Sequence, residues 1–180
     1  DVYRIRLAAG VLTAPSDFMD MTELAMQAGL PQLALDLINA GYANGVLGKD
    51  AGAAREAKLK AMVVKAVADK KATIAADEAA AATAPTGNAL LTVGYNYVTF
   101  GQADKGLAVM QKGLAKGPLD PNIGKLHYGL AQAAAGRTAD AIATLKTVAG
   151  ENGARDIAQL WILKLTPASA AHAAAPAAHH

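Results

Sequence analysis

Hydrophobic and polar positions recur at helical spacing along most of the chain, and glycine and proline divide this pattern into short segments. Phe18, Met21, Ala25 and Ala28 fall three or four positions apart, and Gly29 ends the segment. The same spacing continues from residue 31 and again through 87–150. The pattern therefore predicts an all-α protein made of short helices.

Two glycines show that part of the pattern occurs twice. Gly94 and Gly101 are each followed by another glycine 35 residues later, at Gly129 and Gly136. The same shift aligns small residues with small ones and large apolar residues with large ones, as in the pairs Gly106 and Ala141, Met110 and Leu145, and Gly113 and Val148. A period in the mid-thirties with two amphipathic helices per period is typical of a helical repeat array.

The residues of the first copy resemble the tetratricopeptide repeat (TPR) family. The family's spaced pattern is matched by Leu90, Val93, Gly94, Tyr97, Gly106 and Pro118. The second copy keeps Tyr128, Gly129, Ala141 and Leu145 but departs from the pattern at Lys125 and Gln132. The resemblance covers about residues 1–165 and implies a right-handed α-solenoid of stacked helical hairpins.

This resemblance suggests an organisation and a compartment. The expected parts are a helix at 2–10, repeats at about 16–48, 51–85, 87–118 and 121–150, a capping helix at 154–165, and an Ala/Pro-rich tail at 166–180. The chain begins at Asp1 without Met, so we expect an array cut at its N-terminus, with helix 2–10 as the second half of a pair. The sequence of the repeat resembles those of bacterial TPR proteins exported to the cell envelope. This resemblance suggests that the protein is located in the periplasm or envelope, with the cytoplasm as the alternative.

Several helix ends carry capping signals. We expect Ser16 and Thr138 to cap helices, and Asp120 to cap a helix that opens with Pro121. In the first helix, the expected buried face carries Val2, Ile5 and Ala9. In the last helix, Ile157, Leu160, Trp161 and Leu165 share one face, and Trp161 is expected to cover the final repeat. His179 and His180 are typical of a purification tag.

Residues 51–85 allow two interpretations. The repeat phase favours a hairpin that turns near Asp69–Lys71, with Leu59, Met62 and Val63 on one helix and Ile74 on the other. One long helix is the alternative, because neither glycine nor proline interrupts the segment between Ala53 and Ala84. The segment is basic, through Arg55, Lys58, Lys60, Lys65, Lys70 and Lys71, which we interpret as a solvated face in preference to a site for an acidic partner.

Composition excludes several classes of function. Apolar residues make up 53% of the chain and aromatic residues 4%, and Ala carries much of the apolar share, which suits closely packed helices. A net charge of +2 argues against nucleic-acid binding. The absence of Cys excludes disulfides, and no apolar run approaches the roughly 20 residues that span a bilayer.

The sequence predicts no catalytic, cofactor or metal site. Gly48–Lys49–Asp50 evokes a phosphate-binding loop, but Ala43 replaces its first glycine and Asp50 its Ser/Thr. The serines are Ser16, an expected cap, and Ser169, in the tail, so a hydrolase triad is not expected. His127 has no second ligand at metal-binding spacing. We therefore expect a protein that is not an enzyme.

The TPR resemblance implies instead a concave groove lined by the first helix of each pair. Carried over to this chain, the groove positions are Asp20, Glu23, Gln27, Asn88, Thr92, Tyr95, Thr99, His127 and Leu130. Tyr95 is the leading anchor for a partner, and the alternative is that its ring fills a gap between helices. The family's basic carboxylate clamp is not carried over, because Thr92, Tyr95 and Leu130 occupy its positions.

The expected function is a non-catalytic scaffold that binds a peptide or helix of a partner protein in this groove. The alternative is a structural segment of a larger solenoid or envelope assembly, with self-association and no free groove.

Overall fold

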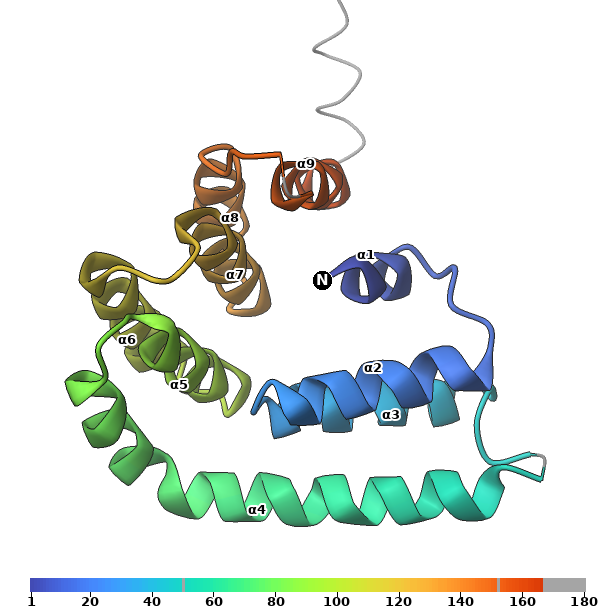
Figure 1. Cartoon of the computed structure of the whole chain (residues 1–180). Coiled ribbons are helices and arrows are strands. Elements are labelled where there is room, and N and C mark those ends of the chain that lie inside the picture. The colour runs from blue at the N-terminus through green and yellow to red at the C-terminus, as the bar shows by residue number, and fades with distance from the viewer. Residues whose placement is uncertain (50, 152, 167–180) are drawn as a thin grey trace, which may run out of the picture.

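The computed structural model describes residues 1–49, 51–151 and 153–166, and every regular element in these ranges is a helix (Figure 1). The helices are α1 (Val2–Ala8), α2 (Pro15–Gln27), α3 (Pro31–Ala43), α4 (Ala53–Thr83), α5 (Asn88–Thr99), α6 (Ala103–Lys116), α7 (Pro121–Ala134), α8 (Thr138–Leu145) and α9 (Ala154–Leu165). The predicted all-α class is confirmed. The predicted tag residues and almost all of the tail lie outside the described residues.

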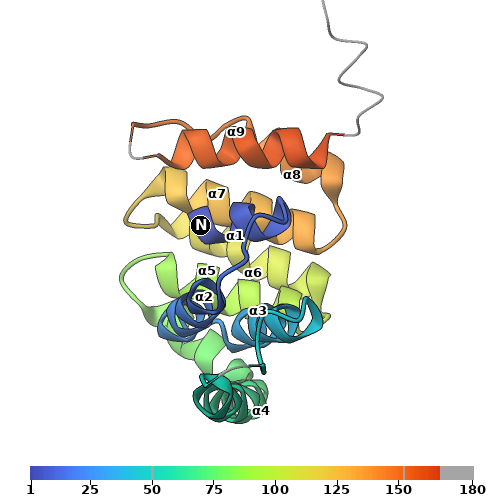
Figure 2. The ribbon, with the colours of Figure 1, turned by 90° about the vertical axis from the view of Figure 1, so that its right-hand side faces the viewer.

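The helices form an arc whose inner side holds the N-terminus. The pairs α2/α3, α5/α6 and α7/α8 follow one another around the arc, and α9 packs on α7 and α8 (Figure 1). Helix α4 runs along the outside, from α3 to α5. Helix α1 lies between α2 and α9 in both ribbon views, so the two ends of the described chain come together (Figure 2).

Glycines allow the close crossing of α5 and α6. A methyl group added at Gly94 would lie 2.6 Å from the carbonyl oxygen of Gly106 and would also overlap Met110. One repeat later, a methyl group at Gly129 would lie 2.8 Å from Leu145, the residue that aligns with Met110. Gly94 and Gly129 therefore both lie where the two helices of a pair touch.

Residues 53–83 form one helix, so the favoured hairpin with a turn near Asp69–Lys71 is wrong. Ala and Lys make up most of the segment and have high helix propensity, which outweighs the repeat phase. Val63, Val67 and Ile74 lie on the buried side, whereas Met62, expected to be buried, is 56% exposed. Four of the basic residues of α4 have partners within the chain: Lys65 pairs with Asp69, Lys70 with Asp77, and Lys60 and Lys71 lie over the rings of Tyr42 and Phe100.

A polar cluster joins the end of α4 to the α5/α6 pair. The hydroxyl of Tyr97, which is 1% exposed, donates to Glu78 at 2.9 Å and accepts from Lys105 at 2.8 Å. Lys105 also contacts the Glu78 carboxylate at 3.1 Å, and the hydrogen bonds from Lys105 and from Tyr97 lower the pKa of the Glu78 carboxyl. The carboxylate is therefore held in its charged form, and the cluster fixes α4 to the arc.

The caps follow the expectation at one helix and depart from it at two. Asp120 caps α7, since its carboxylate accepts from the backbone N–H groups of Asn122 and Ile123. Ser16 does not cap α2, because Pro15 begins the helix one residue earlier. Thr138 is the first helical residue of α8 and not its cap.

The end helices bury partly different faces from those predicted. In α9, Ala154 and Ala158 are buried against Leu126, Leu130 and Leu145, and Trp161 is half-buried beside them. Leu160, expected on the same face, is 49% exposed. In α1, Val2 is exposed, and Leu7 makes the contact with the core around Phe18.

Candidate functional site

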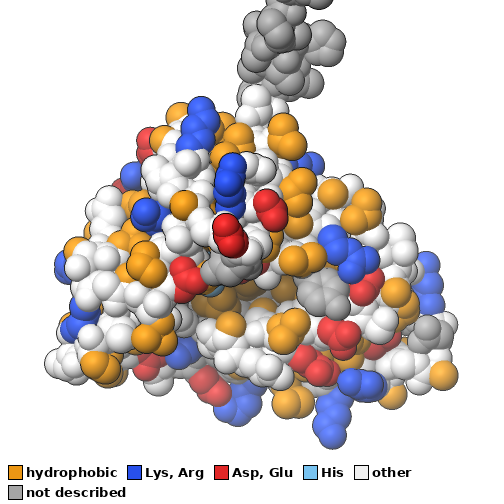
Figure 3. Space-filling view, turned by 45° about the horizontal axis from the view of Figure 1, so that its top comes forward, with side chains coloured by type: hydrophobic (Ala, Val, Ile, Leu, Met, Phe, Trp, Pro, Cys, Tyr) orange, Lys and Arg blue, Asp and Glu red, His pale blue; other side chains and the backbone are white. Residues whose placement is uncertain are grey.

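A cavity of about 420 Å³ lies on the inner side of the arc. Its lining comes from α1, α2, α3, α5, α7 and the loop before α7. The space-filling view shows the hollow near the middle of one face, with hydrophobic side chains in its depth (Figure 3). A volume of this size falls in the range of ligand pockets, roughly 300–1,000 Å³.

One wall of the cavity is apolar. Its side chains come from α2, the loop after it and α3, and include Met21, Leu24, Leu30, Leu33 and Leu37. Leu24 is 51% exposed, so part of the wall is open to solvent. On the opposite rim Leu119 is 80% exposed. Large apolar side chains around a hollow can accept an apolar side chain of a ligand.

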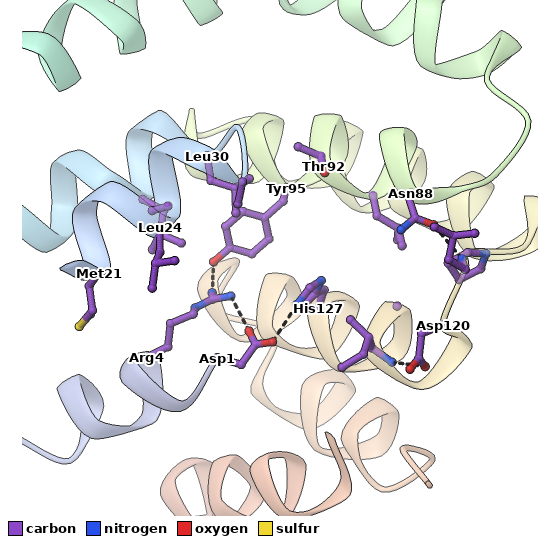
Figure 4. A pocket seen from close by; sticks show the side chains of 18 of the residues that line it. Asp1, Arg4, Met21, Leu24, Leu30, Asn88, Thr92, Tyr95, Asp120 and His127 are labelled. Carbon is purple, nitrogen blue, oxygen red and sulfur yellow. Dashed lines mark hydrogen bonds and ion pairs between the residues drawn. The ribbon is translucent and has the colours of Figure 1, made fainter. Parts of the chain in front are cut away.

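Helix α5 supplies the polar side of the cavity. Asn88, Thr92 and Tyr95 lie four and three residues apart, which places them on one helical face (Figure 4). Asn88 accepts a hydrogen bond of 2.8 Å from the backbone N–H of Leu119 and so holds the loop before α7. Leu119 and the cap residue Asp120 follow in that loop at the rim.

Helix α1 enters the site through Arg4. The Arg4 guanidinium lies 5.0 Å from the centroid of the Tyr95 ring and donates a hydrogen bond to the Tyr95 hydroxyl. It also pairs with the Asp1 carboxylate at 3.9 Å. Asp1 in turn contacts Nε2 of His127 at 3.1 Å. A continuous polar chain therefore runs from α5 through α1 to α7 (Figure 4).

His127 is neutral in this arrangement at neutral pH. Burial, followed by the positive charges of Arg4 and of the amino group at Asp1, lowers the pKa of His127 from 6.5 to about 4. An ionised carboxylate can only accept hydrogen bonds, so Nε2 of the neutral ring carries the proton and donates to Asp1. The contact is a hydrogen bond rather than an ion pair.

Four of the nine predicted groove residues line this cavity: Asn88, Thr92, Tyr95 and His127. Thr99 does not line the cavity; its hydroxyl donates a hydrogen bond to the backbone oxygen of Asn96 in its own helix. Leu130 is 2% exposed and belongs to the core beneath α8 and α9. Asp20 is exposed on α2 and is absent from the cavity wall.

Glu23 and Gln27 lie on another face, in a shallow hollow between α2 and α4. Glu23 pairs there with Arg55 of α4 at 3.3 Å. Asp20 and Glu23, both expected in the groove, therefore lie outside this cavity, and Glu23 faces Arg55 of α4 instead.

Sequence reasoning missed Arg4, Asp1 and the leucine wall. Arg4 and Tyr95 are 91 residues apart, and the apolar pattern of α1 assigned it to a helix pair. Leu24 and Leu33 lie on different helices, so no local pattern marks them as parts of one wall. The available signal was Leu24 itself, a large apolar residue that falls outside the expected apolar face of Phe18, Met21, Ala25 and Ala28.

The described residues contain no group of three or more His, Asp or Glu that could hold a metal ion. None of the described helices combines the length and the apolar character needed to cross a membrane. Comparisons with protein-family models, with curated proteins and with solved structures found no match.

Proposed function

We propose that this protein is a non-catalytic, TPR-like interaction module that binds a segment of a partner protein in the central cavity. The observation that carries the proposal is the pairing of an apolar wall with hydrogen-bonding groups in one hollow of about 420 Å³. Thr92 and Tyr95 offer polar groups beside an apolar surface that includes the exposed Leu24. Such a site suits a peptide or helix anchored by an apolar side chain.

The array would be the right-handed solenoid of the TPR family, with α2, α5 and α7 as the first helices of their pairs. The spacing of 35 residues between Gly94 and Gly129 supports this assignment, as does the matching environment of the two glycines. A bacterial periplasm or envelope remains the proposed compartment, with the cytoplasm as the alternative.

The runner-up function is structural, as a segment of a larger assembly whose groove is filled. The observation in its favour is that α1 already occupies one side of the cavity. In that case the protein would self-associate with rising concentration, as sedimentation velocity can measure, and would not bind added peptides.

A peptide-display selection on the full chain, followed by fluorescence polarisation with the selected peptides, tests the proposal. Ala28 is exposed and lines the cavity, so Ala28→Trp should fill the site without removing a packed side chain. Ala108, exposed on α6, provides the matched Ala108→Trp control. We expect Ala28→Trp to weaken binding at least about tenfold and Ala108→Trp to leave it unchanged. Equal affinity of both variants would place the site elsewhere.

A further inference from the structure

Helix α1 closes one side of the cavity and contacts its walls in the manner of a ligand. Arg4 contributes its guanidinium to the ring and hydroxyl of Tyr95, and Asp1, one turn earlier, accepts from His127. The close-up shows both side chains reaching from α1 toward α5 and α7 (Figure 4). Tyr95 is 5% exposed with α1 in place.

Helix α1 is also held weakly. It has seven residues, which is too short for a helix that is stable by itself. Among Val2 and Arg4–Ala8, no side chain is fully buried. At its other end, Arg6 pairs with Asp17 at 3.7 Å, and Arg6 is 43% exposed. Contacts of this kind contribute little each, so opening of α1 requires far less free energy than global unfolding.

The chain after α1 provides a hinge and an anchor. Gly10 has φ of 72° and no atom near the position of a side chain, so the backbone can turn there freely. Leu12, two residues on, is 5% exposed within the core around Phe18. Residues 1–11 can therefore leave the cavity while the chain stays fixed from Leu12 onward.

We propose that α1 is an internal stand-in for the partner and that the partner binds by displacing it. The partner segment is then an amphipathic helix that places an Arg over Tyr95 and an acidic side chain, one turn earlier, against His127. This proposal rests on the proposed function and gives the chemistry of its partner.

Arg is specified over Lys by the geometry of the contact. The planar guanidinium of Arg4 both covers the Tyr95 ring and donates to its hydroxyl, and it can still pair with Asp1. A Lys ammonium is a point charge that cannot present a flat face to the ring while donating in two directions.

Tethering sets the strength of the competition. A segment joined by a short linker competes at an effective concentration of about millimolar, so α1 should reduce the apparent affinity for a partner. Loss of the Arg4 side chain weakens α1 and leaves Tyr95 and His127 in place. It should therefore strengthen binding of a segment supplied in trans.

The probe for the test is the synthetic peptide DVYRIRLAAGV, which is residues 1–11 of this chain, labelled at its C-terminal end. Fluorescence polarisation compares its binding to the full wild-type chain and to the full Arg4→Ala chain. We expect the Arg4→Ala chain to bind the peptide at least about tenfold more tightly. The exposed Arg55→Ala change, remote from the cavity, should have no effect.

Three further changes identify the contact. The same peptide with Arg4→Ala should lose at least about tenfold in affinity for the Arg4→Ala chain, whereas Arg4→Lys should lose less. Adding Tyr95→Phe to the chain removes the hydroxyl and keeps the ring, so it should weaken binding without disturbing the fold. If the Arg4→Ala chain binds the peptide no better than wild type does, or if the peptide's Arg is dispensable, the proposal is wrong.

The outcome separates this proposal from the proposed function. One outcome is that selected peptides are weakened by Ala28→Trp and yet bind the wild-type and Arg4→Ala chains equally. That result would overturn the displacement of α1 and keep the cavity as the binding site. Failure of every selected peptide to respond to Ala28→Trp would overturn the proposed function itself.

Discussion

Gly94 of α5 and Gly106 of α6 face each other across the crossing of their helices, each without room for a side chain. A methyl group at Gly94 would lie 2.6 Å from the Gly106 oxygen, and one at Gly106 would lie 2.7 Å from the Val98 backbone nitrogen. Because the obstacles are backbone atoms, no side-chain rotation can relieve them.

Gly94→Ala should therefore force α5 and α6 apart and destabilise the protein by about 1–3 kcal/mol, despite the higher helix propensity of Ala. Gly129→Ala is the matched comparison. Its methyl group meets the Leu145 side chain at 2.8 Å, which can turn aside, and the nearest backbone atom lies at 3.5 Å. We expect a change within about 1 kcal/mol. Urea unfolding followed by circular dichroism measures both, and equal losses would contradict this account.

The glycine pairs show which features the sequence could predict. The 35-residue spacing of Gly94 and Gly129 and the Asp120 cap are read from the local sequence; the structure gives both glycines a close contact with the next helix and confirms the cap. The TPR resemblance implies groove positions for Asn88, Thr92 and Tyr95, and these three residues do line the cavity, on one face of α5. Local rules of this kind hold because a helix fixes the direction of each side chain.

The rest depended on contacts that no local pattern records. The docking of α1 needs Arg4 to meet Tyr95, 91 residues away. The link between the α2/α3 and α5/α6 pairs is a hydrogen bond of 2.9 Å from the buried Asn96 amide to the Gly29 oxygen. The α2/α3 and α5/α6 pairs are therefore in direct contact, and α4 lies outside them. The repeat phase instead placed a hairpin between them.

His127 should make stability depend on pH. Its pKa is about 4 in the folded protein, below the ordinary 6.5, so below pH 6.5 the unfolded chain binds a proton that the folded chain does not. The contribution of neutral His127 is present above pH 6.5 and is lost as the pH falls toward 4. The charged groups that face it are Arg4 and Asp1.

Urea unfolding at pH 7.5, 6 and 5 should show a decline for wild type that is smaller in His127→Gln, which keeps a hydrogen-bond donor and cannot titrate. Carboxylates that titrate near pH 5 affect both proteins, so the difference between them is the informative quantity. Parallel curves for the two proteins would show that His127 does not carry the effect.

Helix α9 should be sensitive to charge on one face and insensitive on the other. Ala158 is 1% exposed against the core that contains Leu126 and Leu145, so Ala158→Asp would bury an unpaired carboxylate. We expect a loss of about 3 kcal/mol or more and reduced solubility. Leu160→Asp, at a site that is 49% exposed on the same helix, should change stability by less than about 0.5 kcal/mol.

The single Trp of the chain, Trp161, is partly buried against the core cluster that contains Ala158 and reports on that packing by fluorescence. Its emission should shift toward that of an exposed indole in Ala158→Asp alone. Equal behaviour of the two variants would mean that α9 does not cover the core in solution.

The continuity of α4 can be tested at the place where the repeat phase put a turn. Ala72 is exposed in the middle of the helix, so Ala72→Pro removes no packed side chain and acts on the backbone alone. In a continuous helix this Pro removes a hydrogen bond and clashes with the preceding turn, which costs about 3 kcal/mol or more. In a hairpin turning at Asp69–Lys71 it would open the second helix, where Pro is well tolerated. Ala53→Pro is the matched control, because Ala53 is the first residue of α4 and Pro fits that position in either case. We therefore expect Ala72→Pro to lower the free energy of unfolding and the helical circular dichroism signal. Ala53→Pro should change neither by much. Similarly small effects of both substitutions would show that the segment forms a hairpin and not one helix.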